Sequence, residues 1–186
     1  MRLTLAAPAT VCIALASVVA VAAEPPPGLT LSPDGQEVLD VSGGHAWARC
    51  VEGMRWDGRA CQGEPALFTL AEALAMARAR SETSGRGWRV PRVPELKRFG
   101  DRLAHAAQPA TLAPAAPAGW YWTSTVRIDS EAVNPYAYRN VQRGATESRA
   151  DRLVPQVGWA VDPRSGEARG DMSRRERLPL RLVRSL

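Results

Sequence analysis

Histidine, cysteine and lysine are scarce in this sequence of 186 residues, which contains two histidines, three cysteines and a single lysine, Lys97. His45 and His105 are too few and too isolated for a histidine-based metal site, and neither belongs to a His-Glu-x-x-His motif. The Gly-x-Ser-x-Gly elbow of serine hydrolases is missing as well. These absences exclude the common zinc-peptidase and serine-hydrolase patterns, and we predict neither a metal nor a cofactor.

Arginine carries almost all of the positive charge, since 24 basic residues face 19 acidic ones for a formal charge of +5. Arginine and alanine are abundant along the whole chain, so the charge is weak support for a nucleic-acid partner, and we predict none. With 45% apolar and 23% charged residues, the composition is that of one ordinary domain. The composition therefore bounds the fold class but does not indicate an activity.

The first 23 residues have the pattern of a secretory signal peptide. Arg2 precedes an apolar stretch over residues 3–21, and small residues at 20–23 fit a cleavage site. A retained membrane anchor is the alternative. Residues 24–30 form a proline-rich leader, and residues 31–186 form the domain. We expect an exported protein, periplasmic or extracellular, with no membrane span once the signal is removed.

Removal of the signal also removes Cys12 and leaves Cys50 and Cys61 in an oxidising compartment. Their spacing is too long for a Cys-x-x-Cys redox motif, and a zinc site needs four ligands. A metal pair or redox couple is the competing interpretation, but a structural disulfide fits better. On the chain-entropy model so short a loop is worth roughly 3 kcal/mol.

The pattern of the mature chain predicts an α+β fold. Thr69 and Glu72 form a capping box before a helix, and Pro94 and Glu95 suit the first turn of a second one. Residues 108–119 are rich in alanine and proline and predict a loop, while 126–155 predict a long polar excursion. The expected helices are 69–80 and 94–104, and the expected strands are 29–31, 37–41, 46–50, 120–125, 157–161 and 178–183, with turns at 32–35 and 162–166.

The order of these segments resembles the Lcl C-terminal domain family, named after the end domain of bacterial collagen-like adhesins. The resemblance covers about residues 31–184 and implies a C-type-lectin-like fold, related to that of sulfatase-modifying enzymes, with two helices packed on short antiparallel sheets, long loops and termini that meet in one sheet. It implies an exported or surface protein and no particular reaction. The signature residues are Trp47, Trp56, Trp88, Arg89, Pro91, Glu95 and Arg184.

Aromatic and basic side chains are the candidate ligand-binding groups. We expect Trp120 and Trp122 to lie on one side of a strand with at least one ring exposed, and the other tryptophans, such as Trp47, Trp88 and Trp159, to belong to the core. Arg89 and Arg184 either bind an anion or serve the fold, for instance by pairing with Glu95. The candidate ligand-binding set is Trp120, Trp122, Arg139, Arg143 and Arg149.

The function that fits best is a non-catalytic binding or interaction module of the bacterial envelope or surface, which recognises a glycan or another anionic component. One alternative is a hydrolase that acts on envelope polysaccharide or peptide through two carboxylates in a cleft, about 5 to 10 Å apart. Another is a structural accessory of a surface appendage, with a large apolar patch. The sequence leaves the oligomeric state open.

Overall fold

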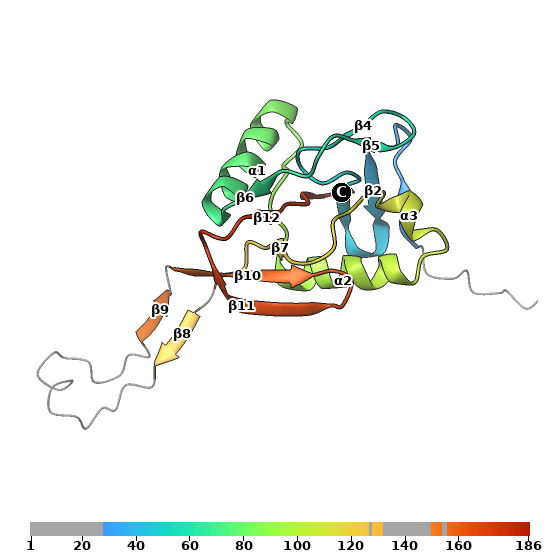
Figure 1. The fold of residues 1–186 in the computed structure, drawn as a ribbon. Helices are drawn as coiled ribbons and strands as arrows, with labels where there is room; N and C mark the ends of the chain where they lie inside the picture. The colour runs from blue at the N-terminus through green and yellow to red at the C-terminus, as the bar shows by residue number, and fades with distance from the viewer. Residues whose placement is uncertain (1–27, 127, 132–149, 154–155) are drawn as a thin grey trace, which may run out of the picture.

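The computed structural model describes residues 28–126, 128–131, 150–153 and 156–186 (Figure 1). The predicted signal peptide lies outside these residues. The described chain has an α+β fold with three α-helices: α1 (Leu70–Ser84), α2 (Val93–Ala104) and α3 (Pro109–Leu112), and one 3-10 turn, η1 (Val41–Gly43). The strands are β1 (Thr30–Leu31), β2 (Glu37–Asp40), β3 (His45–Ala48), β4 (Arg55–Trp56), β5 (Cys61–Gln62), β6 (Leu67–Phe68), β7 (Tyr121–Trp122), β8 (Ile128–Glu131), β9 (Ala150–Leu153), β10 (Val157–Asp162), β11 (Glu167–Ser173), β12 (Leu178–Pro179) and β13 (Val183–Ser185).

A four-stranded antiparallel sheet joins the two ends of the described chain in the order β1-β2-β3-β13. Trp47 on β3 lies between Val38 on β2 and Val183 on β13, and all three side chains are buried. The predicted hairpin of the first two strands is confirmed, and so is the expectation that both ends share one sheet. The finer lectin-like classification stays a prediction.

A second antiparallel sheet has the order β11-β10-β7. The predicted turn at 162–166 is present, but the strand that follows it is β11, which the sequence did not predict. Its residues alternate between exposed and half-buried positions and include several charges, so its apolar signal is weak. The predicted strand 178–183 is instead split, because β12 pairs with β6 and β13 pairs with β3.

Two expected irregular regions contain short elements. In the region 126–155, β8 and β9 pair as antiparallel strands, in register from Ile128–Leu153 to Glu131–Ala150. In the predicted loop 108–119, α3 begins with Pro109 at its first turn, where the missing amide costs no hydrogen bond. All three elements are only four residues long, too short for a clear periodic signal.

Local capping signals set where α1 and α2 begin. The Thr69 hydroxyl accepts a hydrogen bond from Glu72 N (3.3 Å), and the Glu72 carboxylate accepts one from Thr69 N (2.8 Å), which confirms the capping box. The helix continues past the predicted end at 80 to Gly85, whose φ of 65° terminates it. At α2, Glu95 accepts a hydrogen bond from Arg92 N (2.7 Å).

The core consists of two clusters. In one, Trp47 stacks on Phe99 of α2 with ring centroids 4.4 Å apart. In the other, Trp88 and Trp122 pack with the apolar face of α1. Gly100 lets α2 approach the turn after β10, because a Cβ there would lie 2.0 Å from the Pro163 carbonyl oxygen. No helix among the described residues is both long and apolar enough to cross a membrane.

Candidate functional site: the cleft beside the disulfide

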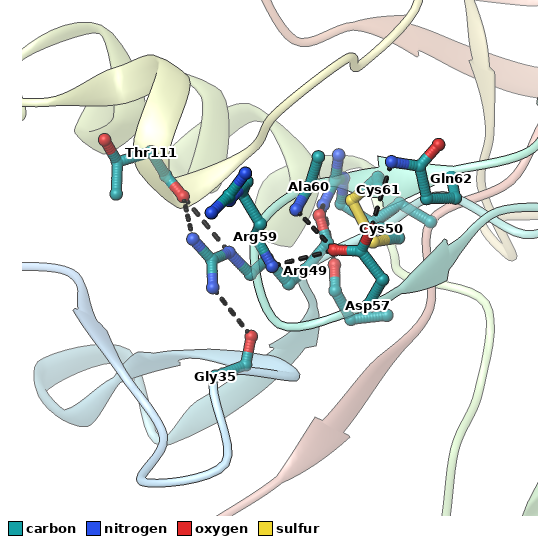
Figure 2. The surroundings of a disulfide bond; sticks show 11 residues. Gly35, Arg49, Cys50, Asp57, Arg59, Ala60, Cys61, Gln62 and Thr111 are labelled. Atoms are coloured by element: carbon teal, nitrogen blue, oxygen red, sulfur yellow. Dashed lines mark hydrogen bonds between the residues drawn. A yellow bond between two sulfur atoms is a disulfide. The ribbon is translucent and has the colours of Figure 1, made fainter.

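The disulfide between Cys50 and Cys61 is formed, with a Cα–Cα distance of 5.6 Å, as predicted (Figure 2). It ties the end of β3 to the hairpin of β4 and β5. Asp57 organises the turn of that hairpin, because its carboxylate accepts hydrogen bonds from the backbone N–H groups of Arg59 (2.7 Å) and Ala60 (2.8 Å). These bonds lower the pKa of Asp57.

Arg49, next to the disulfide, is buried and holds three separate segments together (Figure 2). Its guanidinium donates to the Gly35 carbonyl (2.9 Å) and twice to the Thr111 carbonyl (2.7 and 3.1 Å). The same group lies 3.5 Å from the ring centroid of Trp56, a cation–π contact. Arg49 therefore links the β1–β2 turn and α3 to the hairpin, and it fixes the orientation of the Trp56 indole.

A cavity of about 680 Å³ opens beside these groups, and we call it the disulfide cleft. Its volume falls within the range of small-ligand sites, roughly 300 to 1,000 Å³. The lining combines an indole, an amide and several cationic side chains with exposed backbone. The lining residues are Gln36, Ala48, Arg49, Cys50, Glu52, Gly53, Met54, Arg55, Trp56, Gln62, Gly63 and Arg80.

Glu52 is the acidic residue of the disulfide cleft. It is buried and accepts a hydrogen bond from Arg80 of α1 at 2.9 Å. Burial raises the pKa of its carboxyl, and the neighbouring Arg80 offsets part of that effect. Arg80 also lies 5.5 Å from the ring centroid of Trp88, so the ion pair connects the cleft to the core beneath α1.

Arg55 and Gln62 are two exposed polar residues of the cleft, paired across the β4–β5 hairpin. The Arg55 side chain makes no hydrogen bond or ion pair with another described residue, so its guanidinium is available to an anion. Gln62 donates to Asp57 (3.1 Å). A half-buried indole, a free guanidinium and an amide line the same cavity, which therefore offers an apolar face and donors together and suits an acidic sugar.

The signature residues outside the cleft serve the fold. Arg89 donates two hydrogen bonds to Glu95 (2.7 and 2.8 Å), which confirms the pairing considered for it. Arg184 donates to Glu37 across the first sheet (2.6 Å), a partner that the sequence did not predict. Since Glu37 also binds Arg86 at 2.9 Å, buried carboxylates here are neutralised by arginines from distant segments.

The two tryptophans predicted to bind a ligand, Trp120 and Trp122, do not line the disulfide cleft, and the prediction for Trp122 is wrong. Trp122 is 0% exposed and its indole N–H donates to the Phe68 carbonyl (2.6 Å), so it offers no free face. Trp120 is half-buried, with the guanidinium of Arg169 5.6 Å from its ring centroid. Trp47 and Trp88 are core residues as predicted, whereas Trp159 is only half-buried. The predicted ligand arginines Arg139, Arg143 and Arg149 lie outside the described residues.

Sequence reasoning missed the disulfide cleft because its walls come from four separate segments. Arg49 and Arg80 are 31 positions apart, and nothing local marks them as neighbours. One signal was available: the Trp56-Asp57-Gly58 turn inside the disulfide loop places an aromatic side chain on a rigid hairpin. Trp56 was recognised only as a signature residue.

Acidic side chains do not gather in the cavities of the described structure. Each of four cavities has at most one acidic lining residue, Glu52 in the disulfide cleft and Glu95 in another. The described residues also contain no group of three or more histidine, cysteine, aspartate or glutamate side chains suited to a metal ion. The charged groups of the cleft can therefore bind and orient a ligand, but the cleft lacks a carboxylate pair.

In a comparison with known families, the model of the Lcl C-terminal domain matches residues 36–184. This span includes the strands from β2 to β12, most of β13, the three helices and the disulfide. No curated protein matches the chain significantly.

Proposed function

Because the chain belongs to the Lcl C-terminal domain family, we propose that it is an exported, non-catalytic binding module that recognises an acidic glycan of the cell envelope or surface. The disulfide cleft is the proposed binding site. A fold held together by a disulfide suits a compartment outside the cytoplasm, where such bonds persist.

The observation that carries the proposal is that Trp56, held by Arg49, and the free guanidinium of Arg55 both line the disulfide cleft. The indole is held in place by Arg49, so little conformational entropy is lost when a sugar ring packs on it. Arg55 can then form charge-assisted hydrogen bonds with a carboxylate or sulfate on the same sugar.

The distribution of acidic groups favours binding over hydrolysis. A glycosidase needs two carboxyl groups roughly 5 to 10 Å apart across the scissile bond. Glu52 is the one acidic residue among those that line the cleft, and its carboxylate is already bound to Arg80. We therefore prefer a binding role to the carboxylate-dependent hydrolase.

The proposal is tested by titrating the purified, disulfide-bonded chain with polygalacturonate, an acidic polysaccharide, and with neutral dextran. We expect saturable binding of polygalacturonate and none of dextran. Arg55→Glu should weaken binding roughly tenfold or more, because it replaces a charge-assisted contact with repulsion. Calorimetry or a shift in tryptophan fluorescence measures both effects.

Arg98→Glu is the matched control, because it changes the net charge by the same amount as Arg55→Glu. Arg98 is exposed on α2 and lines none of the four cavities. It should leave the affinity nearly unchanged. Equal losses in both variants would mean that net charge and not the cleft controls binding. Absence of polygalacturonate binding to the wild-type chain would refute an acidic-glycan site.

A further inference from the structure

Arg181 is a buried cation with an unsatisfied donor. The residue lies between β12 and β13 and is 3% exposed. Its Nη1 atom donates to the carbonyls of Ala48 (2.6 Å) and Arg49 (2.7 Å). Its Nη2 atom is buried and has no hydrogen-bond partner among the described residues. Leaving such a donor unsatisfied is costly, and more so for a charged group.

The absence of a counter-ion together with an unsatisfied N–H group distinguishes Arg181 from the other buried charges of the described chain. Glu37, Asp40 and Glu52 each bind an arginine. Arg49 has no carboxylate partner, but all three of its guanidinium nitrogens donate to carbonyls. Arg181 alone combines a buried guanidinium, no ion pair and a free N–H group in the described structure. A buried charge of this kind is costly unless an anion neutralises it.

Arg181 also borders a cavity of about 640 Å³ that is separate from the disulfide cleft and shares no lining residue with it. The walls are almost entirely apolar and come from α2, α3, the segment after α3 and the turn after β10. Apart from Arg181, the lining residues are Leu96, Phe99, Gly100, Leu103, Ala104, Pro109, Ala110, Ala113, Pro114, Ala115, Ala116, Pro117, Tyr121, Pro163 and Arg164.

The polar residues that line this cavity are Arg181, Arg164 and Tyr121, and two of them are cationic. The Tyr121 hydroxyl donates to the Pro117 carbonyl (2.8 Å) and lies near Arg181 without forming a hydrogen bond of normal geometry with it. Burial raises the pKa of the Tyr121 hydroxyl, and the nearby Arg181 and Arg164 offset part of this effect. Arg164 is exposed, and the one acidic group nearby, Asp162, does not line the cavity.

We propose that this cavity binds an apolar monocarboxylate, such as a medium-chain fatty acid, with its carboxylate on Arg181 and its chain along α2 and α3. The buried guanidinium supplies the charge and the free donor, and the alanine, proline and leucine side chains supply the walls. Nη2 is covered by protein atoms, so binding includes a local displacement that exposes this atom to the cavity. The inference does not depend on the glycan site.

The test is calorimetric titration of the purified, disulfide-bonded chain with laurate, dodecan-1-ol and dodecyltrimethylammonium below their micellar concentrations. The three probes have chains with the same number of carbon atoms and differ in the charge of the head group. We expect saturable binding of laurate, binding of the alcohol that is weaker by roughly tenfold or more, and no binding of the cation. Arg181→Lys, which keeps the charge but removes the second donor nitrogen, should also lose roughly tenfold.

A second variant keeps the test decisive if Arg181→Lys does not fold. Ala110 is exposed and lines the cavity, so Ala110→Trp should fill the cavity and abolish laurate binding without loss of thermal stability. Ala79→Trp, on the exposed face of α1 and away from the four cavities, should leave binding unchanged. Equal affinity for laurate and the alcohol, no saturable laurate binding, or full binding by Ala110→Trp would overturn the proposal.

Discussion

At the scale of single residues, this protein neutralises buried and half-buried carboxylates with arginines. Glu95 shows the pattern most fully. It accepts hydrogen bonds from both Nη atoms of Arg89 and from the backbone N–H of Arg92, and it lies 3.4 Å from His45 Nε2. Burial alone would raise the pKa of the Glu95 carboxyl, but these donors outweigh burial and lower the pKa below its ordinary value.

Glu95→Gln should therefore destabilise the protein in a pH-dependent way. A carboxyl whose pKa is lower in the folded state stabilises the fold above its unfolded pKa, and this stabilisation is lost as the pH falls through the folded value. We expect a loss of about 1 kcal/mol at neutral pH, because Arg89 is partly exposed to solvent. The difference from wild type should shrink below about pH 4.5.

Urea unfolding of both proteins across this pH range measures the effect. Glu82→Gln is the control, since Glu82 is exposed on α1 and its side chain makes no ion pair or hydrogen bond with another described residue. If Glu95→Gln lowers the free energy of unfolding by the same amount at every pH, the negative charge of Glu95 does not contribute to stability.

At the scale of elements, local signals predicted some boundaries and left others to tertiary pairing. The Thr69–Glu72 capping box and the Asp57 turn were predictable, because their hydrogen bonds join residues three positions apart or fewer. The edge strand β11 was not predictable, because its own residues lack a clear apolar pattern. Its position in the sheet is set by pairing with β10.

Thr69→Ala tests the capping box at the start of α1. The substitution removes the hydroxyl that accepts a hydrogen bond from Glu72 N, so we expect a loss of about 1 kcal/mol in the free energy of unfolding. Thr83→Ala, in the last turns of the same helix, should be neutral or slightly stabilising, because alanine has the higher helix propensity. Thermal unfolding followed by circular dichroism compares the two, and equal effects would contradict a capping role.

At the scale of the whole molecule, the disulfide joins the first sheet to the hairpin that forms the cleft. Its closure of an 11-residue separation constrains the unfolded chain. Replacement of both Cys50 and Cys61 by alanine should lower the free energy of unfolding by roughly 3 kcal/mol. Urea unfolding with and without a reductant measures this loss.

The double variant should be insensitive to the reductant, which serves as the internal control. The double variant should also bind polygalacturonate more weakly than wild type, because the hairpin that carries Arg55 and Trp56 is no longer tied to β3. Wild-type stability that is unaffected by reduction would show that the bond contributes little to the fold.

The sequence by itself determined the α+β class, the disulfide, the caps of α1 and α2 and the core positions of Trp47 and Trp88, because each depends on local hydrogen bonding, on apolar patterning or on a cysteine count. Only the tertiary structure decided that Trp122 is buried, that Glu37 pairs with Arg184, and that Arg49, Trp56 and Arg80 meet at one cleft. These outcomes depend on contacts between segments far apart in the chain, and no local pattern specifies which charges and rings such packing brings together.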